Sequence, residues 1–141
     1  DFEKMYKVEK IQSVKESKVA LVSTGPLAEI LKEVAALLPK SLKVDILNFH
    51  HLKPINLKKL NDDFKKYENV YCVEEHYHTT GIYSILKINL PNSINIKSLN
   101  TNLDFVSKIG NREFVRKSFG IQKAKIIKTI INDKKNWNRP R

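Results

Sequence analysis

The side chains best suited to chemistry gather in two short segments of this chain. Glu74-Glu75-His76-Tyr77-His78 combines two carboxylates with two imidazoles, and His50-His51 holds the other two histidines. Side chains alternate along an extended segment, so Glu74, His76 and His78 would share one face. Two imidazoles and a carboxylate can bind zinc or share a proton. Hydrogen-bonding residues that shape a domain interface are the other use of such a segment, and we favour it.

Two other sites of chemistry receive little support. Ser23-Thr24-Gly25-Pro26 could offer backbone N–H groups to a phosphate, but a structural turn is the reading we favour. The chain has no G-x-G-x-x-G and no G-K-[ST] segment, which argues against Rossmann and P-loop nucleotide enzymes. It also has no Ser or Cys in a nucleophile elbow. The single cysteine, Cys72, lies in an apolar run, which predicts a buried thiol and a reducing compartment, the cytoplasm.

Alternating strands and helices must position these residues. Apolar runs predict strands at 18–23, 43–48, 69–74 and 94–99, and residues 5–14 could add an edge strand. Helical spacing and capping residues predict helices at about 26–38, 57–64, 81–90, 111–118 and 122–132, with Gly120 as a C-cap between the last two. This alternation is typical of a three-layer α/β/α fold. We expect a lead-in or linker over 1–17, a domain over 18–133 and a basic tail over 134–141.

Composition is that of one ordinary globular domain. The chain has 141 residues, of which 41% are hydrophobic and 29% charged. These values argue against a disordered tail, a collagen-like fibre and a disulfide scaffold. No apolar run approaches the roughly 20 residues of a membrane span. Because the chain begins with Asp1 rather than Met, we expect a fragment of a longer protein or a processed chain.

The net charge of +11 is concentrated near the C-terminus. Residues 108–141 hold 11 Lys and Arg against 2 Asp and Glu. This segment could bind nucleic acid or another polyanion, with nearby Phe114, Phe119 and Trp137 stacking on bases. The alternative is a solvated lysine face and a charged tail, since lysine outnumbers arginine 22 to 4. Besides Lys108, the basic residues are Arg112, Arg116, Lys117, Lys123, Lys125, Lys128, Lys134, Lys135, Arg139 and Arg141, and these ten form the candidate binding region.

Five segments in a fixed order carry a resemblance to a known family. They are the strand, Ser-Thr-Gly turn and helix of 19–38, the segment 48–56 with Lys53-Pro54-Ile55-Asn56, the segment 73–81 with Glu74-Glu75-His76 and Gly81, Asp104-Phe105 with Gly110, and Phe119-Gly120-Ile121. Together they resemble the C-terminal domain of the transketolase-like, thiamine-diphosphate-dependent enzymes. The likeness is greatest to the C-terminal subunit of split transketolases and to deoxyxylulose-phosphate synthase. The beta subunit of 2-oxoacid dehydrogenases has the same domain. The family's Gly-Gly-Leu-Gly is replaced by Thr80-Gly81-Ile82-Tyr83.

The resemblance implies a mostly parallel five-stranded sheet with one antiparallel edge strand, between helices. It also implies an assembly domain of a homodimeric enzyme that transfers two-carbon units between phosphorylated sugars. Thiamine diphosphate and Mg²⁺ would be bound by other domains or subunits, and this domain alone would be inactive. His50, Glu74, Glu75, His76 and Gly81 would then lie at a domain interface or frame the active site. The resemblance leaves open which parent reaction is served.

Overall fold

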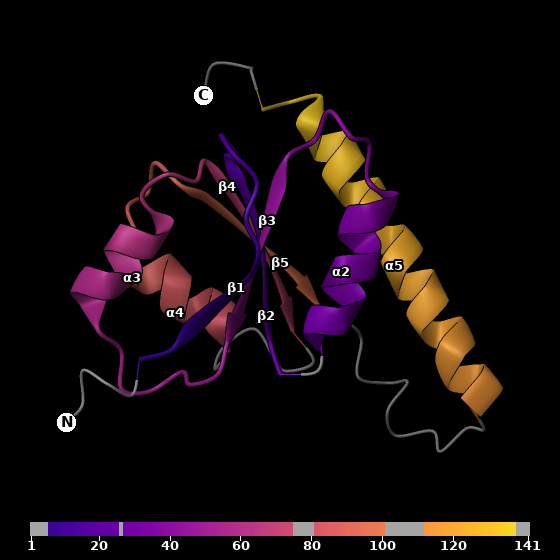
Figure 1. Ribbon diagram of the computed structural model, residues 1–141, viewed down its shortest axis with the longest axis horizontal. Helices are drawn as coiled ribbons and strands as arrows, with labels where there is room; N and C mark the ends of the chain where they lie inside the picture. Colours follow the sequence, from indigo (N-terminus) through magenta and orange to yellow (C-terminus); the bar gives the residue numbers. More distant parts are fainter. Residues whose placement is uncertain (1–5, 26, 75–80, 101–111, 138–141) are drawn as a thin grey trace.

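The computed structural model describes residues 6–25, 27–74, 81–100 and 112–137, and for residues 100 and 112–122 it describes the backbone only (Figure 1). The elements follow the predicted alternation of strands and helices. They are β1 (Val8–Gln12), β2 (Val19–Thr24), α2 (Leu27–Leu37), β3 (Val44–Phe49), α3 (Leu57–Phe64), β4 (Asn69–Glu74), α4 (Ile82–Asn89), β5 (Asn95–Asn100) and α5 (Arg112–Lys134).

The described strands form one five-stranded sheet in the order β1-β3-β2-β4-β5. β1 pairs antiparallel with β3 at one edge. The pairs β3–β2, β2–β4 and β4–β5 are parallel. The predicted α/β fold, with a mostly parallel five-stranded sheet and one antiparallel edge strand, is therefore confirmed.

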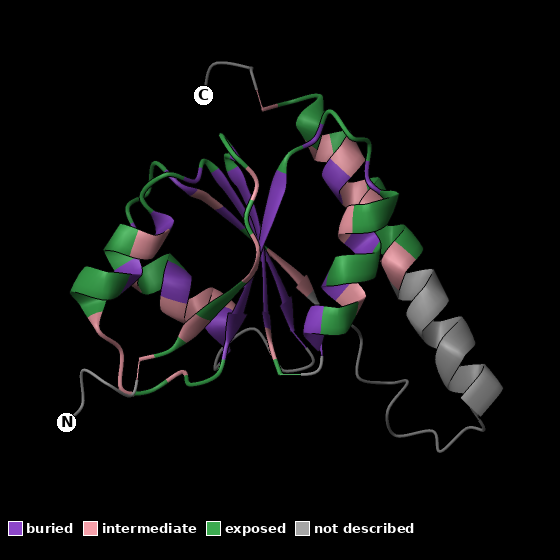
Figure 2. Cartoon of the chain, in the orientation of Figure 1, coloured by how far each residue is buried: buried purple, intermediate pink, exposed green. Residues whose placement is uncertain are grey.

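Helices cover both faces of the sheet, and this explains the continuous apolar runs of its central strands. Side chains alternate along β2, so Ala20 and Val22 face one core while Val19 and Leu21 face the other. The first core lies under α3 and α4, and the second lies under α2 and α5 (Figure 1). Figure 2 shows the buried strands between the two helical layers, whose outer faces are exposed.

The edge strand β1 is irregular in its pairing with β3. The register against β3 shifts between Lys10 and Gln12, which places a bulge at Ile11. A bulge moves the following side chains to the opposite face of the sheet. Val8 and Ile11 are three positions apart, so alternation along the strand already places them on opposite faces, Val8 against the first core and Ile11 against the second.

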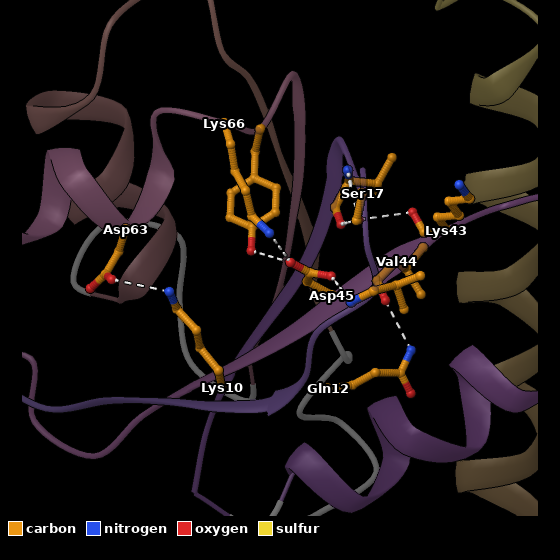
Figure 3. Close-up of polar contacts among 11 residues, drawn as sticks. Lys10, Gln12, Ser17, Lys43, Val44, Asp45, Asp63 and Lys66 are labelled. Atoms are coloured by element: carbon orange, nitrogen blue, oxygen red, sulfur yellow. Dashed lines mark hydrogen bonds and ion pairs between the residues drawn. The ribbon is translucent and has the colours of Figure 1, made fainter.

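A buried carboxylate connects β3 to its neighbours (Figure 3). Asp45 of β3 is fully buried and accepts hydrogen bonds from Lys66 Nζ at 2.5 Å, Tyr67 Oη at 2.6 Å and the Val14 N–H at 2.7 Å. Burial alone would raise the pKa of Asp45, but these three donors outweigh that effect and lower the pKa. The carboxylate thus joins the β1–β2 connection and the α3–β4 connection to the sheet.

The C-terminal helix differs from the prediction. We expected two helices separated by a C-cap at Gly120, whereas α5 runs unbroken over 23 residues. A glycine in a helix interior costs only about 1 kcal/mol relative to alanine. Packing of Ile126 and Ile130 in the second core stabilises the helix by more than this cost. Despite the length of α5, none of the helices in the described parts of the chain is apolar enough over a sufficient length to span a membrane.

Candidate functional site at the carboxyl edge of the sheet

The candidate residues lie where the parallel strands end. Glu74 is the last residue of β4, and His50 directly follows β3. β2 separates these two strands, so the strand axes lie about 10 Å apart. The three strands predicted at 18–23, 43–48 and 69–74 are therefore adjacent in the sheet. Open α/β sheets commonly place functional groups at this edge.

We call Ser23, Asn48, His50, Glu74 and Gly81 the carboxyl-edge site. Of the predicted site residues, the structure thus brings His50, Glu74 and Gly81 to one edge. Glu75 and His76 lie outside the described residues, as does His78, so their predicted placement is untested.

Glu74 connects the end of β4 to the start of α4. Its side chain is buried, and its Oε1 accepts a hydrogen bond from the Ile82 N–H. Its Oε2 accepts a second hydrogen bond from the Tyr83 N–H at 3.2 Å. The first N–H groups of a helix lack partners within the helix, and the helix dipole favours a negative charge there. Glu74 therefore caps α4 and links the end of β4 to the start of α4.

Gly81 provides the space that this cap requires. A Cβ atom at position 81 would lie 2.7 Å from Cδ and 2.8 Å from Oε2 of Glu74. Gly81 has φ of −95°, which any residue can adopt. The glycine is therefore needed because the Glu74 carboxylate occupies the place of a side chain. The two motif residues, Glu74 and Gly81, form one structural unit.

His50 lies on the exposed side of the same edge. Its Nε2 is 2.7 Å from Oε2 of Glu9 in β1, and the two side chains are 36% and 51% exposed. Its backbone N–H donates to the Lys7 carbonyl. Both the imidazole and the backbone of His50 are thus hydrogen-bonded to neighbouring residues, while part of the side chain faces solvent. Such a group can form a polar contact with a partner domain.

Sequence reasoning missed one polar contact of this edge. Ser23 of β2 and Asn48 of β3 are both buried, and Ser23 Oγ donates to Asn48 Oδ1 at 3.3 Å. The two residues are direct neighbours in the parallel register. Each is a polar residue inside an otherwise apolar strand, which is the signal that could have paired them.

Two further predictions concern the thiol of Cys72 and a possible zinc site. Cys72 is completely buried, and burial, followed by the nearby Glu74 carboxylate, raises the pKa of its thiol well above the usual value. The predicted burial of this thiol is confirmed. Among the side chains that the structure describes, no three His, Cys, Asp or Glu residues are grouped to hold a metal ion. The zinc alternative depended on His76 and His78, which are not described.

The described basic residues in and just after α5 are exposed or contact α2 and the loop that follows α2. Lys123 forms an ion pair with Glu33 of α2. Lys134 Nζ donates to Ser41 Oγ at 3.3 Å. Lys125, Lys128 and Lys135 are exposed. The side chains of Arg112, Arg116 and Lys117, and residues Arg139 and Arg141, lie outside the described parts.

The sequence comparison decides the family. Residues 7–126 match the family described as transketolase, C-terminal domain. This match covers both edge strands, β1 and β5, and most of α5. The chain belongs to the transketolase C-terminal domain family. The match includes every residue of the carboxyl-edge site. A search of curated proteins gives no match.

The structural comparison agrees with this assignment. A solved structure titled "Split gene transketolase, inactive beta4 tetramer" superimposes with a TM-score of 0.65 at 18% sequence identity. The superposition covers 89% of this chain and 40% of that chain. This transketolase C-terminal domain therefore shares its fold with part of that subunit, and it spans two fifths of the subunit's length.

Proposed function

We propose that this chain is the assembly domain of a transketolase-type enzyme that transfers two-carbon units between phosphorylated sugars. The observation that carries the proposal is the family match over residues 7–126. The likeness to a split-gene transketolase subunit supports it further, because that protein is titled a tetramer. The partner would be the catalytic part of the same enzyme, as a separate subunit or within one longer chain. The complete enzyme would contain two copies of this domain, and it would be a homodimer if both parts belong to one chain.

The residues of the carboxyl-edge site suit an interface more than a reaction centre. Both carboxylate oxygens of Glu74 accept N–H groups of α4, so this side chain serves the fold. His50, in contrast, is exposed and held by Glu9. We propose that His50 contacts the catalytic part near the entrance to its active site. Glu75 and His76, which follow the same strand, would contribute to that surface.

The cofactor belongs to the partner in this proposal. A diphosphate with Mg²⁺ requires several free oxygen ligands around the metal. Among the described carboxylates near β3 and β4, Glu74 caps α4, and Asp45 binds Lys66, Tyr67 and Val14. These residues therefore do not fit a magnesium diphosphate site. Thiamine diphosphate would supply the two-carbon carrier in the catalytic part. The cytoplasm is the proposed location, supported by a single buried cysteine in place of disulfides.

Reconstitution tests this proposal. The catalytic part is purified without this chain and assayed for two-carbon transfer between phosphorylated sugars, with thiamine diphosphate and Mg²⁺ present. We expect no turnover from either part alone and turnover from the two together. A catalytic part that is fully active and fully assembled without this chain would contradict the proposal.

A further inference from the structure

A polar pocket lies at the edge of the sheet opposite the carboxyl-edge site. Its volume is about 580 Å³, within the range of roughly 300–1,000 Å³ that is usual for small-molecule sites. It is lined by residues at and just before the starts of β4 and β5, by the end of α5 and by the turn that follows α5. Residues that line it include Asn69, Asn95, Lys97, Asp133, Asn136 and Trp137.

Hydrogen bonds hold the polar walls of this pocket in place. Asn95 Nδ2 donates to Asn69 Oδ1 at 3.0 Å across the two strands. Lys97 Nζ lies 3.1 Å and 2.9 Å from the two carboxylate oxygens of Asp133 in α5. The Tyr71 hydroxyl donates to the same carboxylate at 3.1 Å. The site is therefore connected to the sheet and to α5 before any ligand arrives, which lowers the entropic cost of binding.

Trp137 gives the pocket an aromatic wall. Its indole Nε1 is excluded from solvent and has no hydrogen bond of ordinary geometry among the described residues. The indole is still near enough to Tyr71 to oppose part of the rise that burial causes in the pKa of Tyr71. An unsatisfied buried N–H costs stability in the free protein. Trp137 also provides a flat apolar surface beside several amide and hydroxyl groups.

The lining chemistry selects one class of ligand. Amide side chains of Asn69, Asn95 and Asn136 and the Ser93 hydroxyl can both donate and accept hydrogen bonds, as sugar hydroxyls do. Among the described residues that line the pocket, Lys97 is the one cation, and it is paired with Asp133. Glu68 adds a second carboxylate, whose ion-pair partner Lys18, 4.0 Å away, is not among these lining residues. Within this described lining, a phosphate group would meet two carboxylates and no cation that is free of a carboxylate. We propose that this pocket binds a neutral sugar, with one face of its ring against Trp137.

This site is separate from the carboxyl-edge site. Asn69 and Glu74 are the first and last residues of β4, which places the two edges about 17 Å apart. The sugar site therefore does not depend on the proposed assembly function, and it would remain if that function were wrong.

The single tryptophan of the chain gives a direct test. Trp137 is the one tryptophan among 141 residues, so intrinsic fluorescence of the isolated chain reports on this pocket. D-ribose, D-glucose and D-ribose 5-phosphate are titrated into the chain. We expect saturable fluorescence changes with the neutral sugars, with Kd values of about 1–10 mM, and weaker binding of the phosphate ester.

Two asparagines near the C-terminal end of α5 provide matched variants, Asn132 within the helix and Asn136 in the turn that follows it. Asn136→Ala removes a lining amide, whereas Asn132→Ala removes an exposed amide of α5 that does not line the pocket. Loss of one hydrogen bond should weaken ribose and glucose binding about five-fold in Asn136→Ala and leave it unchanged in Asn132→Ala. Circular dichroism checks that both variants fold. No saturable change with either neutral sugar, tighter binding of the phosphate ester, or equal affinities in the two variants would overturn the proposal.

Discussion

Replacing Gly81 by alanine should destabilise the domain through the Glu74 carboxylate. The added Cβ would lie 2.7 Å from Glu74 Cδ and 2.8 Å from Oε2, closer than real Cβ contacts allow. The carboxylate must therefore move, although it is buried and accepts the N–H groups of Ile82 and Tyr83. We expect the start of α4 to lose at least one of these hydrogen bonds.

The magnitude follows from the groups that lose their partners. A hydrogen bond to a charged acceptor contributes about 1.5–3 kcal/mol, and a carboxylate at a helix N-terminus adds about 0.3–1 kcal/mol. Gly81→Ala should therefore lower the free energy of unfolding by about 2–4 kcal/mol. With a urea m-value of about 2 kcal/mol/M, the unfolding midpoint should fall by about 1–2 M.

A second glycine separates this clash from backbone strain. Gly25 has φ of +58°, but a Cβ there would meet nothing within 4 Å. Gly25→Ala should therefore cost only the strain of the left-handed conformation, about 1 kcal/mol. Both variants are compared with the wild-type chain in urea unfolding followed by circular dichroism.

A double-mutant cycle gives the decisive comparison. Once Glu74→Ala has removed the carboxylate, Gly81→Ala should cost less than about 1 kcal/mol, because the group it displaces is gone. If Gly81→Ala costs as much in the Glu74→Ala background as in the wild type, the clash with Glu74 is not the cause. A cost no greater than that of Gly25→Ala would also refute the reasoning.

Three further predictions follow from the described side chains. Because the folded-state pKa of Asp45 is lowered, its contribution to stability is present above the unfolded value of about 3.9 and is lost as pH falls below it. Asp45→Asn should therefore lower the urea midpoint clearly at pH 6 and much less at pH 3, and an equal loss at both values would be inconsistent with this linkage. Cys72 should react with a thiol reagent at pH 8 only after unfolding in urea, so fast labelling of the folded chain would count against its burial. His50→Ala should leave the free energy of unfolding within about 0.5 kcal/mol of wild type but reduce two-carbon transfer in the reconstituted enzyme. Lys43→Ala removes an exposed ion pair with Glu16, 3.2 Å apart, at the other end of β3 and should change neither quantity. Equal activities for the His50 and Lys43 variants would exclude His50 from the interface.

Local chemistry made much of the fold predictable. The strand at 69–74 matches β4 because helices cover both faces of the sheet, which leaves a continuous apolar run with clear ends. Asn56, a residue type that favours helix N-caps, caps α3 and accepts the Lys59 N–H at 3.0 Å. These signals act over a few residues, so the sequence displays them directly.

Features that depend on contacts between distant parts of the chain were harder to predict from the sequence. The bulge at Ile11 is set by pairing with β3, which the sequence of β1 alone does not display. Gly120 resembled a helix stop because local propensity does not include the packing of Ile126 and Ile130. Within the site, Glu74 and Gly81 were recognised as motif residues. Their contact was not predicted, because the sequence alone does not show that residues 74 and 81 lie against each other.

The central claim is that this domain assembles with the catalytic part of a transketolase-type enzyme. Its most direct test is affinity capture of the native assembly, followed by intact mass spectrometry. The account predicts that the 141-residue sequence is found within a longer chain, or with a second subunit, that contains a Gly-Asp-Gly…Asn-Asn diphosphate segment. Recovery of this chain at its own mass of 16.4 kDa, with no partner, would contradict the account and make the basic C-terminal residues the leading indication of function.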